Sequence, residues 1–287
     1  MKKITALILA LVCVLALSAC SGISLPGISY YNEYADAAKY STGDFTYNAS
    51  EVKEIEINWV SGNIEIIQSD ADTLSVRESG GTLETDEQMH YYLRAGTLII
   101  HYCGSGYKKN IDASAKNLKI EIPENISLDV DNVSAGVKIG NINAKDIDIS
   151  SVSGSVTFAD VTADDIDIEM VSGELTMASV SADNFSADGV SGNIKVSSLS
   201  ASEIDVQIVS GKTELGLTKD CDLEISGVSG SVKIALPAGI GATLEFSTVS
   251  GSLSSELEYT KDKERYTFGT GEIEIDVETV SGNVSVE

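Results

Sequence analysis

The chain has 287 residues, a formal net charge of −25 and few aromatic residues. An acidic excess of this size argues against nucleic acid and anionic lipid surfaces as partners, because both are polyanions that bind Lys and Arg. Cations or basic surfaces fit this composition better. A long chain that is neither aromatic-rich nor Pro-rich is compatible with one or two ordinary domains or with a repeat architecture.

The first residues have the pattern of a secretory signal. Two lysines at positions 2 and 3 precede an apolar run, Ile4–Leu17, which is shorter than the roughly 20 residues that span a bilayer. The run closes with Leu17-Ser18-Ala19-Cys20, which resembles the bacterial lipobox. The resemblance implies removal of residues 1–19, lipidation of Cys20 and anchorage of an extracytoplasmic protein to the membrane. An ordinary signal peptide with a chance cysteine is the alternative.

Three regions are expected after the signal. Residues 20–50 lack sustained apolar periodicity and are predicted to be a tether to the lipid. Alternation of apolar and polar residues begins at Val52 and predicts strands. We divide the predicted β domain, 51–287, into degenerate coils (51–130), regular coils (131–250) and C-terminal coils (251–287). The last part contains a charged insertion, Glu256–Gly271, that is expected to form a hairpin before a final coil ends the chain.

The regular region is organised by the phrase Val-Ser-Gly. Copies begin every 19 residues at positions 133 (a variant), 152, 171, 190, 209 and 228, and further copies begin at 60, 249 and 280. Apolar residues recur four, six, fourteen and sixteen positions after each Val, which gives two short strands per repeat with one face buried. Propeller blades need about 40 residues each. The pattern therefore predicts an all-β, single-stranded parallel β-solenoid (β-helix) with coils of about 19 residues and atypical capping coils at both ends.

The phrase itself is interpreted as a corner of the coil. In this interpretation the valine points inward, the serine bonds to nearby backbone groups, and the glycine supplies a positive φ. The predicted corner glycines are Gly62, Gly154, Gly173, Gly192, Gly211, Gly230, Gly251 and Gly282.

Two acidic columns are expected on the outside of the stack, because equal positions of successive coils lie one above another. Thirteen residues after each Val stand Asp146, Asp165, Glu203 and Asp222, and two residues further on stand Asp148, Asp167, Asp205 and Glu224. Oxygen ligands suit hard cations, so these residues are weak candidates for Ca²⁺ or for a basic surface. The sequence favours the alternative of a solvated face that keeps the stack soluble. No other metal or cofactor is predicted.

No catalytic group is identified. The repeated serines have no base beside them, and His90 and His101 have no recognisable partners. Cys103 and Cys221 are either a disulfide or two buried thiols, and the sequence leaves both open. A polysaccharide-acting enzyme on a β-helix scaffold would need a local cluster of acids with Lys, Arg or His, whereas the repeat spreads its acids evenly.

The lipobox, the segments Tyr40–Phe45 and Asn58–Ile64, the Val-Ser-Gly coils and the closing segment Thr279–Val284 together resemble the bacterial putative-adhesin family, a domain of unknown function in surface lipoproteins. The resemblance implies a β-solenoid, an envelope location and no catalytic residues to carry over. We expect a non-enzymatic surface binding or scaffold protein, with an envelope glycan or surface protein as partner. An accessory role in envelope-stress sensing, suggested by family context, is the remaining alternative.

Overall fold

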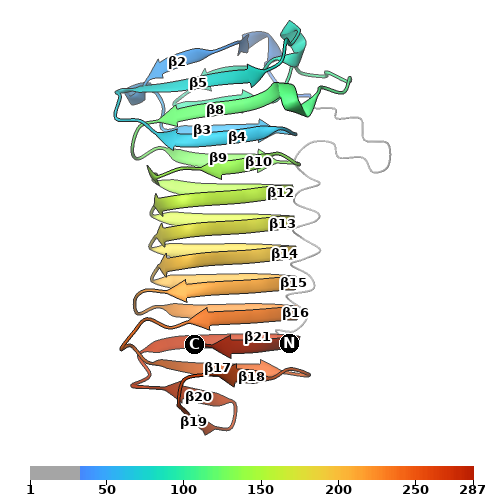
Figure 1. The fold of residues 1–287 in the computed structure, drawn as a ribbon. Coiled ribbons are helices and arrows are strands. Elements are labelled where there is room, and N and C mark those ends of the chain that lie inside the picture. The colour runs from blue at the N-terminus through green and yellow to red at the C-terminus, as the bar shows by residue number, and fades with distance from the viewer. Residues whose placement is uncertain (1–32) are drawn as a thin grey trace.

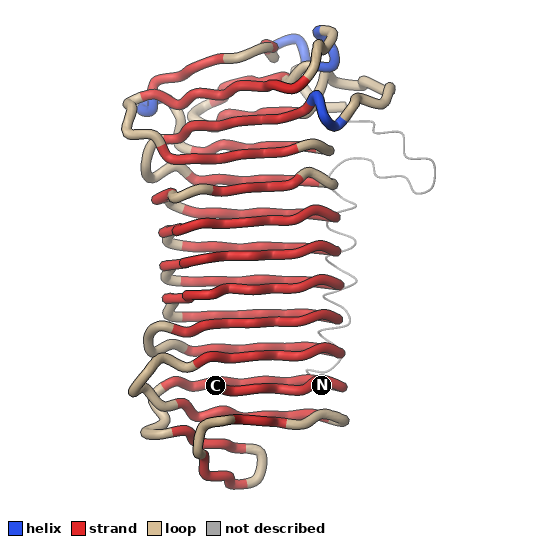
Figure 2. The backbone as a smooth tube through the Cα atoms, in the orientation of Figure 1, coloured by secondary structure: helices blue, strands red, loops and turns tan. Residues whose placement is uncertain are grey.

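The structure, a computed structural model that describes residues 33–287, is a tall stack of β coils (Figures 1 and 2). This confirms the predicted parallel β-solenoid.

Four short 3-10 helices are present in the described part of the chain: η2 (Ala37–Lys39), η3 (Ala49–Glu51), η4 (Thr85–Glu87) and η5 (Ala113–Ala115). The strands, in chain order, are β1 (Ser41–Thr42), β2 (Phe45–Asn48), β3 (Glu54–Trp59), β4 (Asn63–Gln68), β5 (Thr73–Gly80), β6 (His90–Arg94), β7 (Thr97–His101), β8 (Lys116–Ile122), β9 (Ser127–Asn132), β10 (Gly136–Ile139), β11 (Ile142–Asn143), β12 (Asp146–Thr162), β13 (Asp165–Ser181), β14 (Asn184–Ser200), β15 (Glu203–Leu217), β16 (Asp222–Ala235), β17 (Ala242–Thr248), β18 (Leu253–Ser255), β19 (Tyr259–Asp262), β20 (Arg265–Phe268) and β21 (Ile273–Val286).

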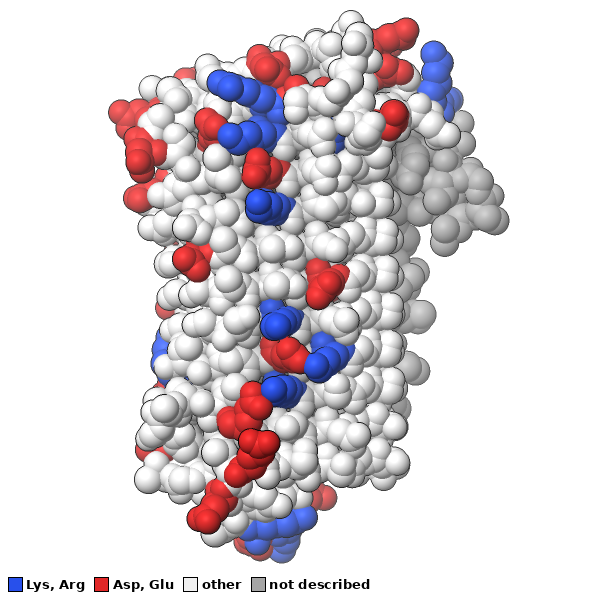
Figure 3. All heavy atoms as spheres, viewed as in Figure 1, with Lys and Arg blue, Asp and Glu red and all other residues white. Residues whose placement is uncertain are grey.

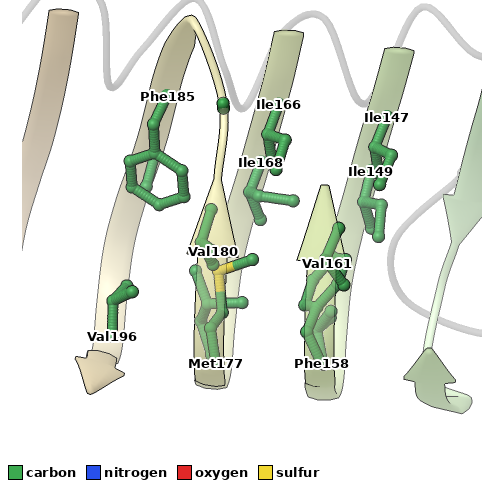
Figure 4. Packing of buried hydrophobic residues seen from close by; sticks show 14 of the residues in the cluster. Ile147, Ile149, Phe158, Val161, Ile166, Ile168, Met177, Val180, Phe185 and Val196 are labelled. Atoms are coloured by element: carbon green, nitrogen blue, oxygen red, sulfur yellow. The ribbon is translucent and has the colours of Figure 1, made fainter. Parts of the chain in front are cut away.

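The regular coils are long, bent strands that pair in parallel at equal repeat positions. In β12 and β13, for example, Ile147 lies beside Ile166 and Phe158 beside Met177. Figure 4 shows these side chains pointing into the space enclosed by the coil. Each buried aliphatic or aromatic side chain contributes roughly 1.5–3 kcal/mol to folding. The repeat therefore builds one continuous core along the axis of the stack.

The Ser-Gly part of the phrase forms a tight corner. The hydroxyl of Ser172 donates a 3.1 Å hydrogen bond to the carbonyl oxygen of Val152 in the preceding coil. Gly173 has a φ of 133°, and a Cβ built on it would lie 2.2 Å from the carbonyl oxygen of Gly154. Glycine is required there both by conformation and by the close approach of the next coil. Gly62, Gly154, Gly192, Gly211 and Gly230 also have positive φ, whereas Gly251 and Gly282 do not.

The valine of the phrase points outward, so the prediction of an inward valine is wrong. The residue before it is buried, as at Met170 and Ile208, and the valines themselves are partly exposed. The exposed fraction reaches 69% at Val249 and 44% at Val280. Strand alternation runs unbroken into the valine, and the phase of the alternation shifts only at the following Ser-Gly corner.

At the N-terminal end the order of coils in space differs from the order in sequence. Strands β3 and β4 lie between the β7–β8 level and the β9–β10 level. β5 runs antiparallel to β2 and β8, and β6 runs antiparallel to β1 and β7. The region 51–130 is thus only in part the predicted run of degenerate coils: β3, β4, β7, β8 and β9 pair in parallel, whereas β5 and β6 pair only antiparallel and form a cap. Residues 41–48, assigned to the tether, are β strands of this cap.

The C-terminal end repeats this arrangement. β21 pairs with β16 on one side and with β17 and β18 on the other, so the last strand of the chain lies inside the stack. The final coil ends the chain, as predicted from the sequence, but it is an inner level of the stack. The charged insertion forms the β19–β20 hairpin, and β20 pairs with β17 at the outer edge (Figure 1).

Candidate binding face

The predicted acidic columns lie on one outward sheet face, formed by the first half of each long strand. The register places Asp146 beside Asp165 and Asp148 beside Asp167. Neighbouring strands are about 4.8 Å apart. The same column positions continue into Glu203, Asp205, Asp222 and Glu224 of the next coils. Both columns also extend further than predicted, through Glu54, Glu56, Asp129, Glu245, Glu274 and Asp276.

A third acidic column was not anticipated. It lies two residues beyond the second, at the next outward position, and includes Asp131, Glu169, Asp188 and Glu278. The period-two alternation of the strand was sufficient to find it, since positions 13, 15 and 17 of each repeat share one face. Serine and glutamine interrupt this column, which hides it in a search for repeated acids.

The three columns carry acids without cations. No Lys or Arg occupies a column position in the described strands β3, β9, β12–β17 and β21. Two ion pairs flank the face, Lys145 with Asp146 at 2.6 Å and Arg265 with Glu274 at 3.6 Å. By contrast, Figure 3 shows a face of the stack on which sparse charges of both signs are intermixed.

The acidic face is hollowed into a groove of about 680 Å³ over β13–β17 and β21. Carboxylates such as Asp167, Asp205 and Asp276 line it, together with the aliphatic edges of Ile204 and Leu223. The groove therefore combines negative charge with apolar surface, which suits a ligand that carries both basic and apolar groups.

Burial and mutual repulsion hold protons on this face. Burial, together with the neighbouring charge of Asp131, raises the pKa of Asp129 to about 7. Burial likewise raises the pKa of Asp188 to about 7, with Asp205 as the strongest charged neighbour. One carboxylate oxygen of each of Asp188 and Asp205 is buried and has no hydrogen-bond partner among the described residues. Like charges are thus crowded at a site where water compensates them incompletely.

The structure does not assemble the predicted calcium candidates into a coordination cage. Among residues 33–287, no group of three or more His, Cys, Asp or Glu side chains converges to hold a metal ion. The acids face one another along columns, whereas Ca²⁺ takes six to eight converging oxygens.

The histidines, cysteines and repeated serines considered in the sequence analysis make contacts typical of structural residues. His101 stacks on Tyr34 with ring centroids 3.9 Å apart, and burial lowers the pKa of His101 to about 4. His90 lies directly opposite on β6. Cys103 and Cys221 are both buried free thiols. Within the described part of the chain, the repeated serine hydroxyls donate to backbone carbonyls, as a structural ladder would.

The predicted signal peptide and Cys20 lie outside the described residues. Within those residues, no helix has the length and apolarity to cross a membrane.

The profile of the Toastrack DUF4097 family matches residues 52–287. The chain belongs to this family. The Toastrack match begins just before β3 and covers the whole stack, including the β21 strand that returns between β16 and β17. No curated protein matches the sequence.

Several solved structures are similar to this chain at low sequence identity. One, described as a putative adhesin from Bacteroides fragilis NCTC 9343, is 14% identical, with a TM-score of 0.42, and the alignment covers 86% of this chain and 97% of that one. A second, from Parabacteroides distasonis ATCC 8503, is 14% identical with a TM-score of 0.43 and the same coverage. A third, from Parabacteroides merdae ATCC 43184, is 12% identical with a TM-score of 0.43, and the alignment covers 87% of this chain and 96% of that one.

Proposed function

We propose that the protein is a lipid-anchored, extracytoplasmic and non-enzymatic binding protein whose acidic sheet face engages a basic partner at the cell envelope. The observation that carries this proposal is the set of three neighbouring carboxylate columns on one sheet face. The first two columns line the groove, and no column position in the described strands holds a cation. A basic ligand would neutralise the crowded carboxylates, and opposite charges also speed encounter.

The cost of the face favours a role in binding over solubility alone. Unit charges about 4.8 Å apart repel by nearly 1 kcal/mol in bulk water and by more where water is excluded. A face used only for solubility works best when its charges are fully hydrated. Here the carboxylates of Asp129 and Asp188 are sufficiently desolvated that their pKa values reach about 7. Desolvated carboxylates with strongly raised pKa values are typical of a surface that binds a partner.

The anchor follows from the lipobox-like ending at Cys20. Tyr34 is already part of the fold, since its hydroxyl donates to the carbonyl oxygen of Cys103 at 3.2 Å. A lipid on Cys20 would therefore tether the protein through a short segment that joins the antiparallel cap. The acidic face would run away from the point of attachment along the axis of the stack.

Two variants with equal charge change test the binding face. The face variant carries Asp167→Asn, Asp205→Asn and Glu224→Gln. The control variant carries Asp160→Asn, Glu174→Gln and Glu258→Gln, three exposed acids that are neither at nor next to a column position. Binding of wild type to arrays of purified envelope proteins and glycans is expected to select basic proteins, and the face variant should lose at least tenfold in affinity while the control does not. Equal losses, or glycan cleavage by the protein, would overturn the proposal.

Cell fractionation tests the anchor separately. Wild-type protein is expected in the membrane fraction and exposed to added protease, while Cys20→Ala is expected to be released from the membrane. Retention of the Cys20→Ala protein in the cytoplasm together with wild type would contradict an extracytoplasmic location.

A further inference from the structure

A column of valines borders the acidic face along the whole stack. These are the first residues of the Val-Ser-Gly phrases, and each occupies the outward position next to the third acidic column. In spatial order they are Val60, Val133, Val152, Val171, Val190, Val209, Val228, Val280 and Val249. All are at least partly exposed, and we call this column the valine stripe.

The stripe is held at a regular spacing by the corner beside it. Serine hydroxyls bond each level to the carbonyl of the valine in the level before, for example Ser210 to Val190 at 3.3 Å and Ser153 to Val133 at 3.2 Å. The adjacent glycines have no side chain, and the valines of the inner coils are partly exposed. The result is a straight apolar ridge with one valine every 4.8 Å or so.

The valines of the inner coils are partly exposed, and Val280 and Val249 near the C-terminal end are more so. A row of partly exposed apolar side chains that continues over many coils is unusual on the surface of a stack. The fold does not demand valine here, because the buried position is the preceding residue and the turn is made by serine and glycine. A partner that covers these valines would gain a free energy of about 25 cal/mol for every Å² of apolar surface removed from water.

The charge of the neighbouring columns decides what could cover the stripe. A second copy of this chain would bring its own acidic columns alongside and repel. Anionic glycans are repelled for the same reason. Neutral glycans are usually held by exposed aromatic rings, and the column positions of the described strands carry none. A basic polypeptide satisfies both the acids and the stripe.

We propose that the acidic face and the valine stripe together bind a basic amphipathic helix that lies along the axis of the stack, an inference that rests on the proposed binding function. An α-helix repeats every 5.4 Å and the coils repeat every 4.8 Å or so, so the two repeats differ by about 0.6 Å per turn and stay within half a coil of each other over about four turns. A helix of about 20 residues is roughly 30 Å long and spans about six coils. Its aliphatic stripe covers the valines while Lys or Arg on the adjoining face reaches the third and second acidic columns.

The probe is a fluorescently labelled 20-residue peptide with Leu along one helical face and Lys along the adjoining face. Its control is a scrambled peptide of the same composition and charge. In fluorescence anisotropy titrations, wild type is expected to bind the amphipathic peptide at least tenfold more tightly than the scrambled one. Equal affinities for the two peptides would overturn the proposal and leave a surface that recognises charge alone.

A stripe variant localises the effect. Val171→Thr, Val190→Thr and Val209→Thr keep the β-branched shape of the corner but make it polar, and circular dichroism melts verify that the variant folds. Its affinity for the amphipathic peptide is expected to fall to that of the scrambled peptide, with scrambled-peptide binding unchanged. An unchanged affinity would overturn the proposal. If neither peptide binds wild type, the proposed function fails too, whereas charge-only binding that the face variant abolishes leaves that function standing.

Discussion

The hydroxyl of Ser134 donates a 2.8 Å hydrogen bond to the carbonyl oxygen of Val60, across a separation of 74 residues. This contact joins the first Val-Ser-Gly phrase directly to the regular stack. The β3–β4 level is consequently held on both sides, by the cap above and by β9–β10 below. β21 is held in the same way at the other end. The Val-Ser-Gly copies that begin at Val60 and Val280 therefore both lie in inner levels of the stack, with a neighbouring level on each side.

Truncation after Gly271 tests the position of β21. If β21 were the outermost coil, its removal would expose one level and leave the rest intact. In the observed order, loss of β21 removes the level between β16 and β17. The β17–β20 segment is then left without β21, its parallel partner. We expect limited proteolysis to digest residues 236–271 rapidly in the truncated protein and to spare them in the full chain. Equal resistance of this segment in both proteins would contradict the observed strand order.

Two alanine substitutions in one coil test the close packing of the corner. At Gly192 a Cβ would lie 2.2 Å from the carbonyl oxygen of Gly173, and φ is 154°. At Gly189 a Cβ would meet only side-chain atoms of Ile208 and Ile194, at 3.6 Å or more. We expect Gly192→Ala to destabilise the protein by about 2 kcal/mol or more and Gly189→Ala to stabilise it by about 0.4–1 kcal/mol. Urea unfolding measures both, and equal effects would refute this account of the corner.

Lys116 and Glu78 form a buried ion pair in the cap. The lysine side chain is fully buried, donates to the carbonyl oxygens of Tyr102 and Glu87 at 2.5 and 2.8 Å, and lies 4.9 Å from the ring centroid of Trp59. Lys116→Met leaves Glu78 as an unpaired buried carboxylate, and we expect a loss of about 3–5 kcal/mol. The double variant Lys116→Met with Glu78→Gln should recover part of that loss. Strictly additive losses in a double-mutant cycle would show that the two side chains do not interact.

The raised pKa of Asp188 predicts a pH dependence of stability. The folded protein keeps this proton up to about pH 7, while the unfolded chain loses it near pH 4. The folded state therefore binds more protons over this interval, so the contribution of Asp188 to stability falls as pH rises from 4 to 7. Asp167, Glu169 and Asp205 are the charged groups that face it and raise its pKa beyond the effect of burial.

The Asp188→Asn variant isolates this contribution. We expect its melting temperature to exceed that of wild type by a growing margin between pH 5 and pH 8, at roughly 2–4 °C per kcal/mol for a protein of this size. His101, whose pKa is lowered to about 4, acts in the opposite direction but is present in both proteins. A margin that does not change with pH would show that Asp188 titrates normally.

The period of the sequence was enough to predict what depends on equal spacing. It places Ile147 inside the coil and Asp148 above Asp167, because a constant repeat fixes the register of parallel strands. The period could not show whether the valine side chain faces into the coil or outward, since the phase shift at Ser-Gly depends on backbone conformation. It also could not show that β21 follows β16 in space, because a repeated phrase carries no record of which copy stacks on which.

The candidate site was predicted in part for the same reason. The first two acidic columns repeat their residue type, whereas Glu169 and Asp188 share a column with serine and glutamine. The groove is lined by residues of β13–β17 and β21, so it appears only once these strands are placed side by side. The valine stripe was visible as a repeat, but only the structure shows that it is on the surface.

The most direct test of the binding face is a valine-methyl NMR titration of the protein with the amphipathic peptide. The stripe valines and the buried valines, such as Val156, Val180 and Val196, provide probes outside and inside the same coils. We expect saturable shifts at the methyl groups of Val152, Val171, Val190, Val209 and Val228, with the buried valines nearly unchanged. Shifts confined to other parts of the molecule, or none at all at saturating peptide, would contradict the assignment of this face as the binding surface.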